Sequence, residues 1–565
     1  MIFFCKKVIR PLVNLCKTHR IPLIILLFTW GSYFFILFTR TLEFEPEGLY
    51  TNHANVYGDW PLHIGMANIF AYKEPQDWFA YHPIYADGKF TYGFLTNLIS
   101  GILMRLGFPL YFSFVVPSII YIVLLLLGFY VLFNLILKSK KQSLVAISIF
   151  FLSSGLGFFR FIRDLLNGEP IRALFFPDPA LDYTQQAQYG WPTSNLVVGI
   201  FLPQRAFLLG MTMAIWALIG VVYVIQNQEL SFKKRTLILL GSSLLAGLLP
   251  IVHTHSLIVL FIVTGLLCLS SYKNWIELFL FYAVPTSFLG ITLYLVFISG
   301  GIEDPDFMQW RPGWNADGGF IAWVIMWLKL WGLMLPVAAA GFLLIRKRSL
   351  QIKAFFLGFF LLFLVGNLVQ FQPNPWDNTK LFAWSYLSFS GLATIVLAWI
   401  WKYGGRYLGR IDAILLTILL TFTGFLELTR LQRLEETYHP FISSQDDINL
   451  AVKIREKTDP LARFLIAPLH THLVTMWAAR PVLLGYPGWA SSHGFLIAQT
   501  EQDIRTMFLG NEDAETLLTE HQISYVAIGP DELNYWQANE DYYAKHYPVV
   551  FRNKNYRIYD VRSRR

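Results

Sequence analysis

Asp59 is the residue whose position in this sequence best suits catalysis, because it follows the first hydrophobic segment in a stretch rich in aromatic and histidine side chains. An aspartate just outside a membrane is readily solvated, so burial does not explain its presence. A carboxylate at the outer mouth of a membrane protein can take a proton from a substrate hydroxyl, as a general base. We therefore expect Asp59 to act on a lipid-linked substrate.

The composition is that of a membrane protein with many spans. Of its 565 residues, 55% are hydrophobic, 17% are aromatic and only 15% are charged, whereas soluble domains carry about 25% charged residues. The apolar residues occur in runs of about 20, which is enough to cross about 30 Å of hydrocarbon as a helix. Backbone polar groups in lipid must be satisfied internally, so these runs are predicted to be helices.

Eleven runs are predicted to span the membrane. The run 319–345 is long and contains Pro336, which predicts a broken or partly re-entrant helix. Two other runs are short and flank a hairpin at His253-Thr254-His255. The predicted spans are residues 21–39, 111–137, 143–159, 194–225, 237–252, 256–271, 276–298, 319–345, 354–370, 381–401 and 411–429.

Basic residues predict the orientation. They gather in short loops that the eleven spans place on one side, which the positive-inside rule makes cytoplasmic. The tail 1–20 is then cytoplasmic and the C-terminal region 430–565 is outside. The net charge of +8 follows from this arrangement and does not indicate nucleic-acid binding. The basic residues on this side are Lys6, Lys7, Arg10, Lys17, Arg20, Lys138, Lys140, Lys141, Lys233, Lys234, Arg235, Lys273, Arg346, Lys347, Arg348, Lys353, Lys402, Arg406 and Arg410.

The positions of the cysteines and the absence of N-glycosylation acceptor sites favour a bacterial inner membrane. Cys5, Cys16 and Cys268 all fall on or near the predicted cytoplasmic side, so the outer region is expected to fold without disulfides. The sequence also contains no Asn-x-Ser/Thr acceptor site. Both features are more typical of a bacterial inner membrane than of a eukaryotic secretory one.

Several cations lie near the predicted outer edge of the spans and suit a phosphorylated lipid head group. Arg205 lies inside the fourth run, Lys380 opens the tenth, and His253 and His255 cap the fifth. A charge at membrane depth marks either a functional site or a paired structural one. Three structural alternatives therefore stay open. Arg205 forms a structural ion pair, the two histidines are interfacial residues, or Lys380 is an ordinary interface anchor.

Other polar side chains on the outer side are candidates for substrate contact. The loop 40–92 is the longest between spans, and its residues 61–72 are predicted to form a short helix in the membrane interface. The segment 485–494 around His493 is either a substrate-facing loop or a tight structural turn. Candidate substrate-facing residues are His63, His82, Asp377 and His493, and the acids that rival Asp59 are Glu303, Asp304 and Asp306.

The tail 430–565 is predicted to be an extracytoplasmic α/β domain. At this length it can bury its own core. Residues 500–521 have apolar positions at helical spacing. Strands are predicted at 464–467, 481–484, 524–528, 548–551 and 556–559.

The layout resembles that of the GT-C superfamily of integral-membrane glycosyltransferases, which includes protein mannosyltransferases and aminoarabinose transferases. The likeness lies in a basic start, one span, a large outer loop carrying Gly58-Asp59-Trp60, many further spans and an outer C-terminal domain. Trp60 stands where the protein mannosyltransferases have a second acid, which argues against a protein acceptor. Short motifs also resemble those of bacterial members: Phe201–Arg205, Gly247–His255, Asp377–Lys380 and Gly485–Gly494.

This resemblance implies a function. Asp59 would be the general base, and the basic side chains of later loops, Arg205, His253, His255 and Lys380, would hold the lipid phosphate. The donor would be a sugar on a polyprenyl phosphate, the acceptor a lipid or glycan, and the single displacement would invert the sugar carbon. No cofactor is implied, although a divalent metal is compatible with such a site. A transporter or flippase for lipid-linked precursors, or a non-catalytic assembly protein, is the alternative.

Overall fold

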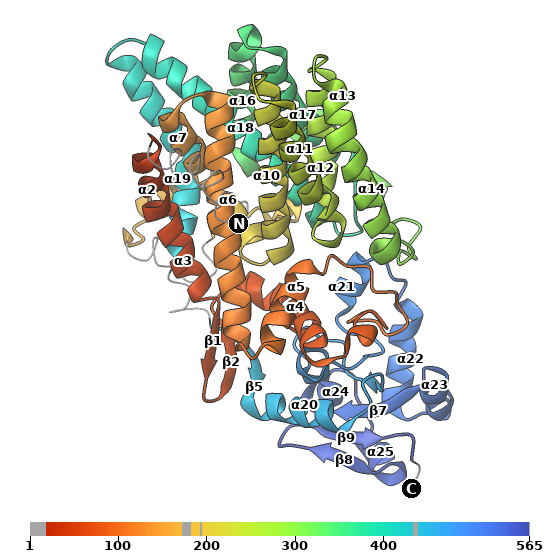
Figure 1. Ribbon diagram of the computed structural model, residues 1–565. Helices are drawn as coiled ribbons and strands as arrows, with labels where there is room; N and C mark the ends of the chain where they lie inside the picture. The colour runs from red at the N-terminus through yellow and green to blue at the C-terminus, as the bar shows by residue number, and fades with distance from the viewer. Residues whose placement is uncertain (1–17, 172–181, 192–194, 433–438, 564–565) are drawn as a thin grey trace.

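The computed structural model describes residues 18–171, 182–191, 195–432 and 439–563, with long helices in one part and a mixed domain at one end (Figure 1). Residues 1–17 of the predicted basic tail 1–20 lie outside the described residues. Seven helices within this part of the chain are long and apolar enough to cross a membrane. They are α2 with α3 (Arg20–Thr39), α6 (Leu110–Leu137), α10 (Arg205–Gln226), α11 (Phe232–Gly247) with the turn that follows it to Ile251, α13 with α14 (Trp275–Ile298), α18 (Thr379–Tyr403) with the turn that precedes it from Pro375, and α19 (Leu408–Leu431).

The remaining predicted spans are shorter or bent, so the count of eleven is not confirmed. Helices α12 (Thr254–Leu269) and α17 (Leu350–Gly366) are apolar but short. Helix α7 (Lys140–Phe151) ends well before residue 159. The polytopic helical fold itself is confirmed, because α6, α10, α11, α12, α17 and α18 pack on one another as a bundle (Figure 1).

The predicted break in 319–345 occurs at a glycine and not at the proline. Helices α15 (Gly319–Trp331) and α16 (Met334–Leu344) meet at 92°. Gly332 between them has φ 58° and ψ −131°, which a residue with a side chain rarely adopts. Pro336 lies in the first turn of α16, where its missing N–H costs no helical hydrogen bond.

The loop 40–92 begins with a hairpin that pairs with the C-terminal part of the chain. Strands β1 (Leu42–Glu45) and β2 (Gly48–Thr51) are antiparallel, and β2 pairs with β5 (Phe441–Ser444). Gly48 approaches β5 so closely that a Cβ there would lie 2.1 Å from the Ser443 carbonyl oxygen. This position therefore requires glycine.

The expected interfacial helix at 61–72 is longer and more deeply placed than predicted. Helix α4 spans Ala54–Tyr72, and its residues 60–71 are buried. It packs against α5 (Leu95–Arg105) on one side and against the C-terminal segment Val474–Ala478 on the other. Its apolar residues therefore face protein, and the interfacial position of this helix stays a prediction.

The C-terminal α/β domain contains a four-stranded sheet in the order β6-β7-β9-β8, with β6 parallel to β7 and the other pairs antiparallel. The predicted strand at 481–484 makes only one isolated bridge, from Phe464 to Val482. The elements are β6 (Arg463–Leu465), β7 (Ile523–Ile528), β8 (Val549–Arg552), β9 (Arg557–Asp560), α20 (Gln445–Lys457), α21 (Pro487–Ser492), α22 (Ala498–Leu509), α23 (Ala514–Glu520), α24 (Pro530–Asn534) and α25 (Glu540–His546).

Candidate active site

A polar cavity of about 380 Å³ lies where the membrane helices meet the C-terminal domain. Its walls come from α4, the start of α10, the segment before α18, and C-terminal residues around α21. The fold therefore brings together parts of the chain that are hundreds of residues apart. Six of the residues singled out in the sequence line this cavity: Asp59, His63, His253, Asp377, Lys380 and His493.

Asp59 is held at the cavity by the residues on either side of it in α4. Trp60 is fully buried, and its Nε1 donates to the Pro203 carbonyl at 3.1 Å. Asn55 Nδ2 donates to the Val198 carbonyl at 2.8 Å. Both bonds join α4 to the chain just before α10, so they fix the rotation of the helix and the direction of its carboxylate.

The Asp59 carboxylate itself makes no hydrogen bond to another residue that the structure describes. Burial raises its pKa to about 6, with Lys380 acting to lower this pKa and Asp377 to raise it. A carboxylate with this pKa is mostly ionised at pH 7 and is more basic than an ordinary aspartate. It therefore has the protonation state and basicity that suit a general base.

Lys380 places a positive charge at the same cavity, in the first turn of α18. Its Nζ donates to Asp377 Oδ1 at 2.6 Å, and both side chains are largely buried. Asn378 fixes this turn, because its Nδ2 donates to the Gly366 and Val369 carbonyls. The Asp377 carboxylate thus holds the Lys380 ammonium group at the cavity and offsets part of its positive charge.

His253 contributes a ring nitrogen from the turn before α12. Its Nδ1 accepts the backbone N–H of Ser256 at 3.3 Å and so caps the helix. The neutral ring then carries its proton on Nε2, which has no partner among the described residues. His255 stacks on His253 with ring centroids 5.3 Å apart, but it does not line the cavity.

Three further histidines lie around the α4 side of the cavity and are held neutral by burial. His63 and His493 line it, and burial lowers the pKa of each to about 3. His63 Nδ1 accepts from Asn97 Nδ2 at 3.1 Å. His82 is fully buried behind the wall, where its Nε2 is 3.2 Å from His493 Nδ1. His82 therefore positions His493 and has no direct access to the cavity.

Aromatic side chains from the C-terminal domain form one wall. The rings of His470 and Tyr486 stack with centroids 3.4 Å apart, and Trp489 packs edge-on against both, at 5.0 and 5.4 Å. Tyr486 and Trp489 belong to the segment 485–494, which the sequence predicted only to be a loop or a tight turn. His470 was missed, because it lies outside every short motif and only the tertiary fold brings it to Tyr486.

Comparison with solved structures gives this architecture a known fold. ArnT from Cupriavidus metallidurans in the apo state matches with a TM-score of 0.51 and 10% identity, over 95% of this chain and 97% of that chain. The chain has the GT-C fold. The Archaeoglobus fulgidus oligosaccharyltransferase in the apo form matches with a TM-score of 0.47 and 12% identity, over 95% and 74%. No family model and no curated protein sequence matches.

Within this GT-C fold, Arg205 takes a structural position and not the phosphate-binding one expected of it. Its side chain is fully buried, and it does not line the cavity. Nη2 donates to Ser100 at 2.7 Å and Nε to Ser118 at 3.2 Å, while the guanidinium lies over the Phe114 ring at 4.2 Å. Two hydroxyls and an aromatic face thus take the place of a carboxylate partner.

The rival acids lie away from the cavity, beside the turn that follows α21. The backbone amides of Glu303 and Asp304 donate to the Gly494 carbonyl at 2.8 and 2.9 Å. The Glu303 carboxylate accepts the Leu496 N–H at 3.1 Å. Glu303 and Asp304 therefore fasten the loop 299–318 to the C-terminal domain, and neither they nor Asp306 line the cavity.

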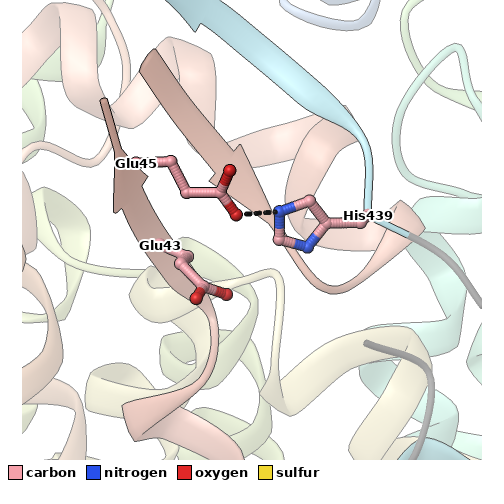
Figure 2. Close-up of side chains that lie close together, drawn as sticks. All are labelled: Glu43, Glu45 and His439. Atoms are coloured by element: carbon pink, nitrogen blue, oxygen red, sulfur yellow. Dashed lines mark hydrogen bonds and ion pairs between the residues drawn. The ribbon is translucent and has the colours of Figure 1, made fainter. Parts of the chain in front are cut away.

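Side chains that could bind a metal ion come together outside this cavity. Among the residues described, one group of three such side chains has donor atoms within 4.8 Å of one another: Glu43, Glu45 and His439 (Figure 2). This group lies at the β1–β2 hairpin and not in the cavity.

Proposed function

We propose that this protein is a membrane glycosyltransferase that moves a sugar from a polyprenyl-phosphate donor to a lipid or glycan acceptor at the outer face of the membrane. The observation that carries this proposal is Asp59, an acid without a hydrogen-bonding protein partner among the described residues, which lines the same cavity as Lys380. The GT-C fold supports the same reaction class.

The reaction would be a single displacement. Asp59 takes the proton of an acceptor hydroxyl as its oxygen attacks the anomeric carbon. The bond from this carbon to the phosphate oxygen breaks, and polyprenyl phosphate leaves with the electron pair. Lys380 and the Nε2–H of His253 offset the charge that develops on the phosphate. One displacement without an enzyme nucleophile inverts the anomeric configuration.

A second, apolar cavity supports a lipid-linked donor. It has a volume of about 1160 Å³ and is lined by α12 and by the helix from Trp275 to Ile298. Thr254 lines this apolar groove while its neighbour His253 lines the polar cavity. A prenyl chain in the groove would thus place its phosphate beside His253.

The aromatic wall supports a sugar as the transferred group. Saccharide rings present C–H faces that pack on aromatic rings, while their hydroxyls need polar partners. Trp489 and Tyr486 offer such faces, and Ser492 and Asn374 line the same cavity with polar atoms. The C-terminal domain would therefore select the sugar or the acceptor, and the membrane helices would hold the lipid phosphate.

A transfer assay tests the proposal. The purified protein in lipid nanodiscs would be given a panel of synthetic polyprenyl-phosphate sugars and envelope lipid acceptors, with release of polyprenyl phosphate as the readout. We expect release with at least one donor, an inverted product by NMR, and loss of release in Asp59→Asn. Transbilayer movement of these lipids without any release from the panel would instead favour a flippase.

A further inference from the structure

The cluster Glu43, Glu45 and His439 joins the start of the first outer loop to the entry of the C-terminal domain. The two glutamates alternate on β1 and so share one face of the strand. His439 comes just before β5, which pairs with β2 of the same hairpin. Figure 2 shows the Glu45 carboxylate directed at the His439 ring with Glu43 beside them.

Asn52 determines which nitrogen of His439 carries a proton. The Asn52 Nδ2 donates to the Arg40 carbonyl at 2.7 Å, which turns its carbonyl oxygen Oδ1 towards the ring. This oxygen is 2.7 Å from His439 Nδ1, and an amide oxygen only accepts hydrogen bonds. His439 Nδ1 must therefore be the protonated nitrogen, and in the neutral ring Nε2 carries the lone pair.

That lone pair faces a carboxylate. His439 Nε2 is 3.1 Å from Glu45 Oε1, and both atoms are acceptors when the ring is neutral. Either a second proton on the ring or a bound cation must lie between them. Glu43 brings a second carboxylate to the same place, and the three donor atoms lie within 4.8 Å of one another. Ligands about 2.1 Å from one Zn²⁺ lie roughly 3.4 Å apart, so small side-chain rotations complete a site.

Two further contacts of His439 match those of a metal-binding histidine. A metal-binding histidine usually donates its other N–H to a carbonyl or carboxylate, as His439 does to Asn52. The Tyr50 ring stacks on His439 with centroids 4.5 Å apart and fixes the plane of the imidazole. An imidazole with two carboxylates favours Zn²⁺ or Mn²⁺, since Mg²⁺ and Ca²⁺ prefer oxygen ligands alone.

We propose that Glu43, Glu45 and His439 bind a divalent transition-metal ion that joins the β1–β2 hairpin to the C-terminal domain. Asn52, which supports His439, is the residue between β2 and the N-cap of α4. The ion therefore braces the start of the helix that carries Asp59, without touching the substrate cavity. This site is independent of the proposed transferase activity.

Zinc binding to the full-length protein in detergent tests the proposal. After removal of metal with a chelator, we expect Zn²⁺ to bind with one equivalent more in the wild type than in His439→Gln by isothermal titration, and to raise the wild-type melting temperature. Mg²⁺ should do neither. The matched control Glu47→Gln alters an exposed glutamate of the same hairpin that is not part of the cluster, and should bind like the wild type.

Glu43→Gln provides a second variant, because Glu43 is exposed and its loss leaves the Glu45–His439 contact intact. It should fold normally and bind Zn²⁺ at least tenfold more weakly at this site. Equal zinc binding in the wild type, Glu43→Gln and His439→Gln would overturn the proposal. That result would leave the contact as a proton-mediated ion pair between Glu45 and an imidazolium ring.

Discussion

Replacing Asp59 by asparagine should reduce catalysis and raise stability in the same molecule. The amide keeps the shape of the side chain but cannot accept the acceptor proton, and general-base catalysis contributes about 100- to 10,000-fold. Burial of the ionised carboxylate is unfavourable, which is why its pKa rises from 3.8 to about 6. Each pKa unit corresponds to about 1.4 kcal/mol, and solvent in the cavity offsets part of the cost of burying the charge. Removal of this charge should therefore raise the free energy of unfolding by roughly 1–3 kcal/mol.

The pH dependence gives the sign of this effect. The native pKa of Asp59 lies above that of the unfolded chain, so the wild type loses stability as pH rises from about 4 to about 6. Asp59→Asn has no such loss. The difference in melting temperature between the two proteins should be close to zero at pH 4, and at pH 7 the variant should melt higher. Scanning fluorimetry in detergent across this range measures the difference.

The control is Asp77→Asn, which makes the same chemical change in the same loop, 40–92, but outside the cavity. It should leave transfer unchanged. An Asp59→Asn protein that keeps near-normal turnover would remove Asp59 from the chemistry. A variant that loses both activity and stability would show that Asp59 acts through the packing of α4, against the reasoning above.

Further predictions concern the cavity walls and the topology. Lys380→Met removes the charge that lowers the pKa of the base, so the acidic limb of the pH–rate profile should move to higher pH, while Asp377→Asn should move it to lower pH. Trp489→Ala removes a stacking face worth about 1 kcal/mol, which should raise KM about fivefold with kcat changed less. Reporter fusions after Lys141 and after residue 565 should report cytoplasmic and outer positions, respectively; a cytoplasmic signal from the second would refute the orientation.

Hydrophobic runs predicted the fold well because a long apolar run in a membrane protein has few other options than a spanning helix. They predicted less well where helices are short or bent. The angle between α15 and α16 depends on Gly332, whose backbone conformation no periodicity reveals. The burial of α4 was also missed, because an apolar face reads the same whether lipid or a distant domain covers it.

Residues of the site could be predicted where their signal is local in the sequence, but not where their role depends on residues far away in the chain. His253 and Lys380 could be selected because each lies next to the predicted outer end of a hydrophobic run, and Asp59 because it follows the first run in a stretch rich in aromatic and histidine side chains. Arg205 satisfied the same rule, yet its partners, Ser100 and Ser118, are hydroxyls more than 80 residues away that no pattern marks. His470 carried no signal of its own, so only the tertiary fold could assign it to the cavity.

Helix α4 explains why the cavity needs both halves of the molecule. Its first half is bonded to the chain before α10 through Asn55 and Trp60. Its second half is bonded to the C-terminal domain, where Asn68 Nδ2 donates to the Met476 carbonyl at 2.7 Å. Gly65 lets the two backbones meet, because a Cβ there would lie 2.6 Å from the Thr475 carbonyl oxygen. The base and the aromatic wall are therefore fixed to each other through α4, and a small displacement of the C-terminal domain would change the distance between them.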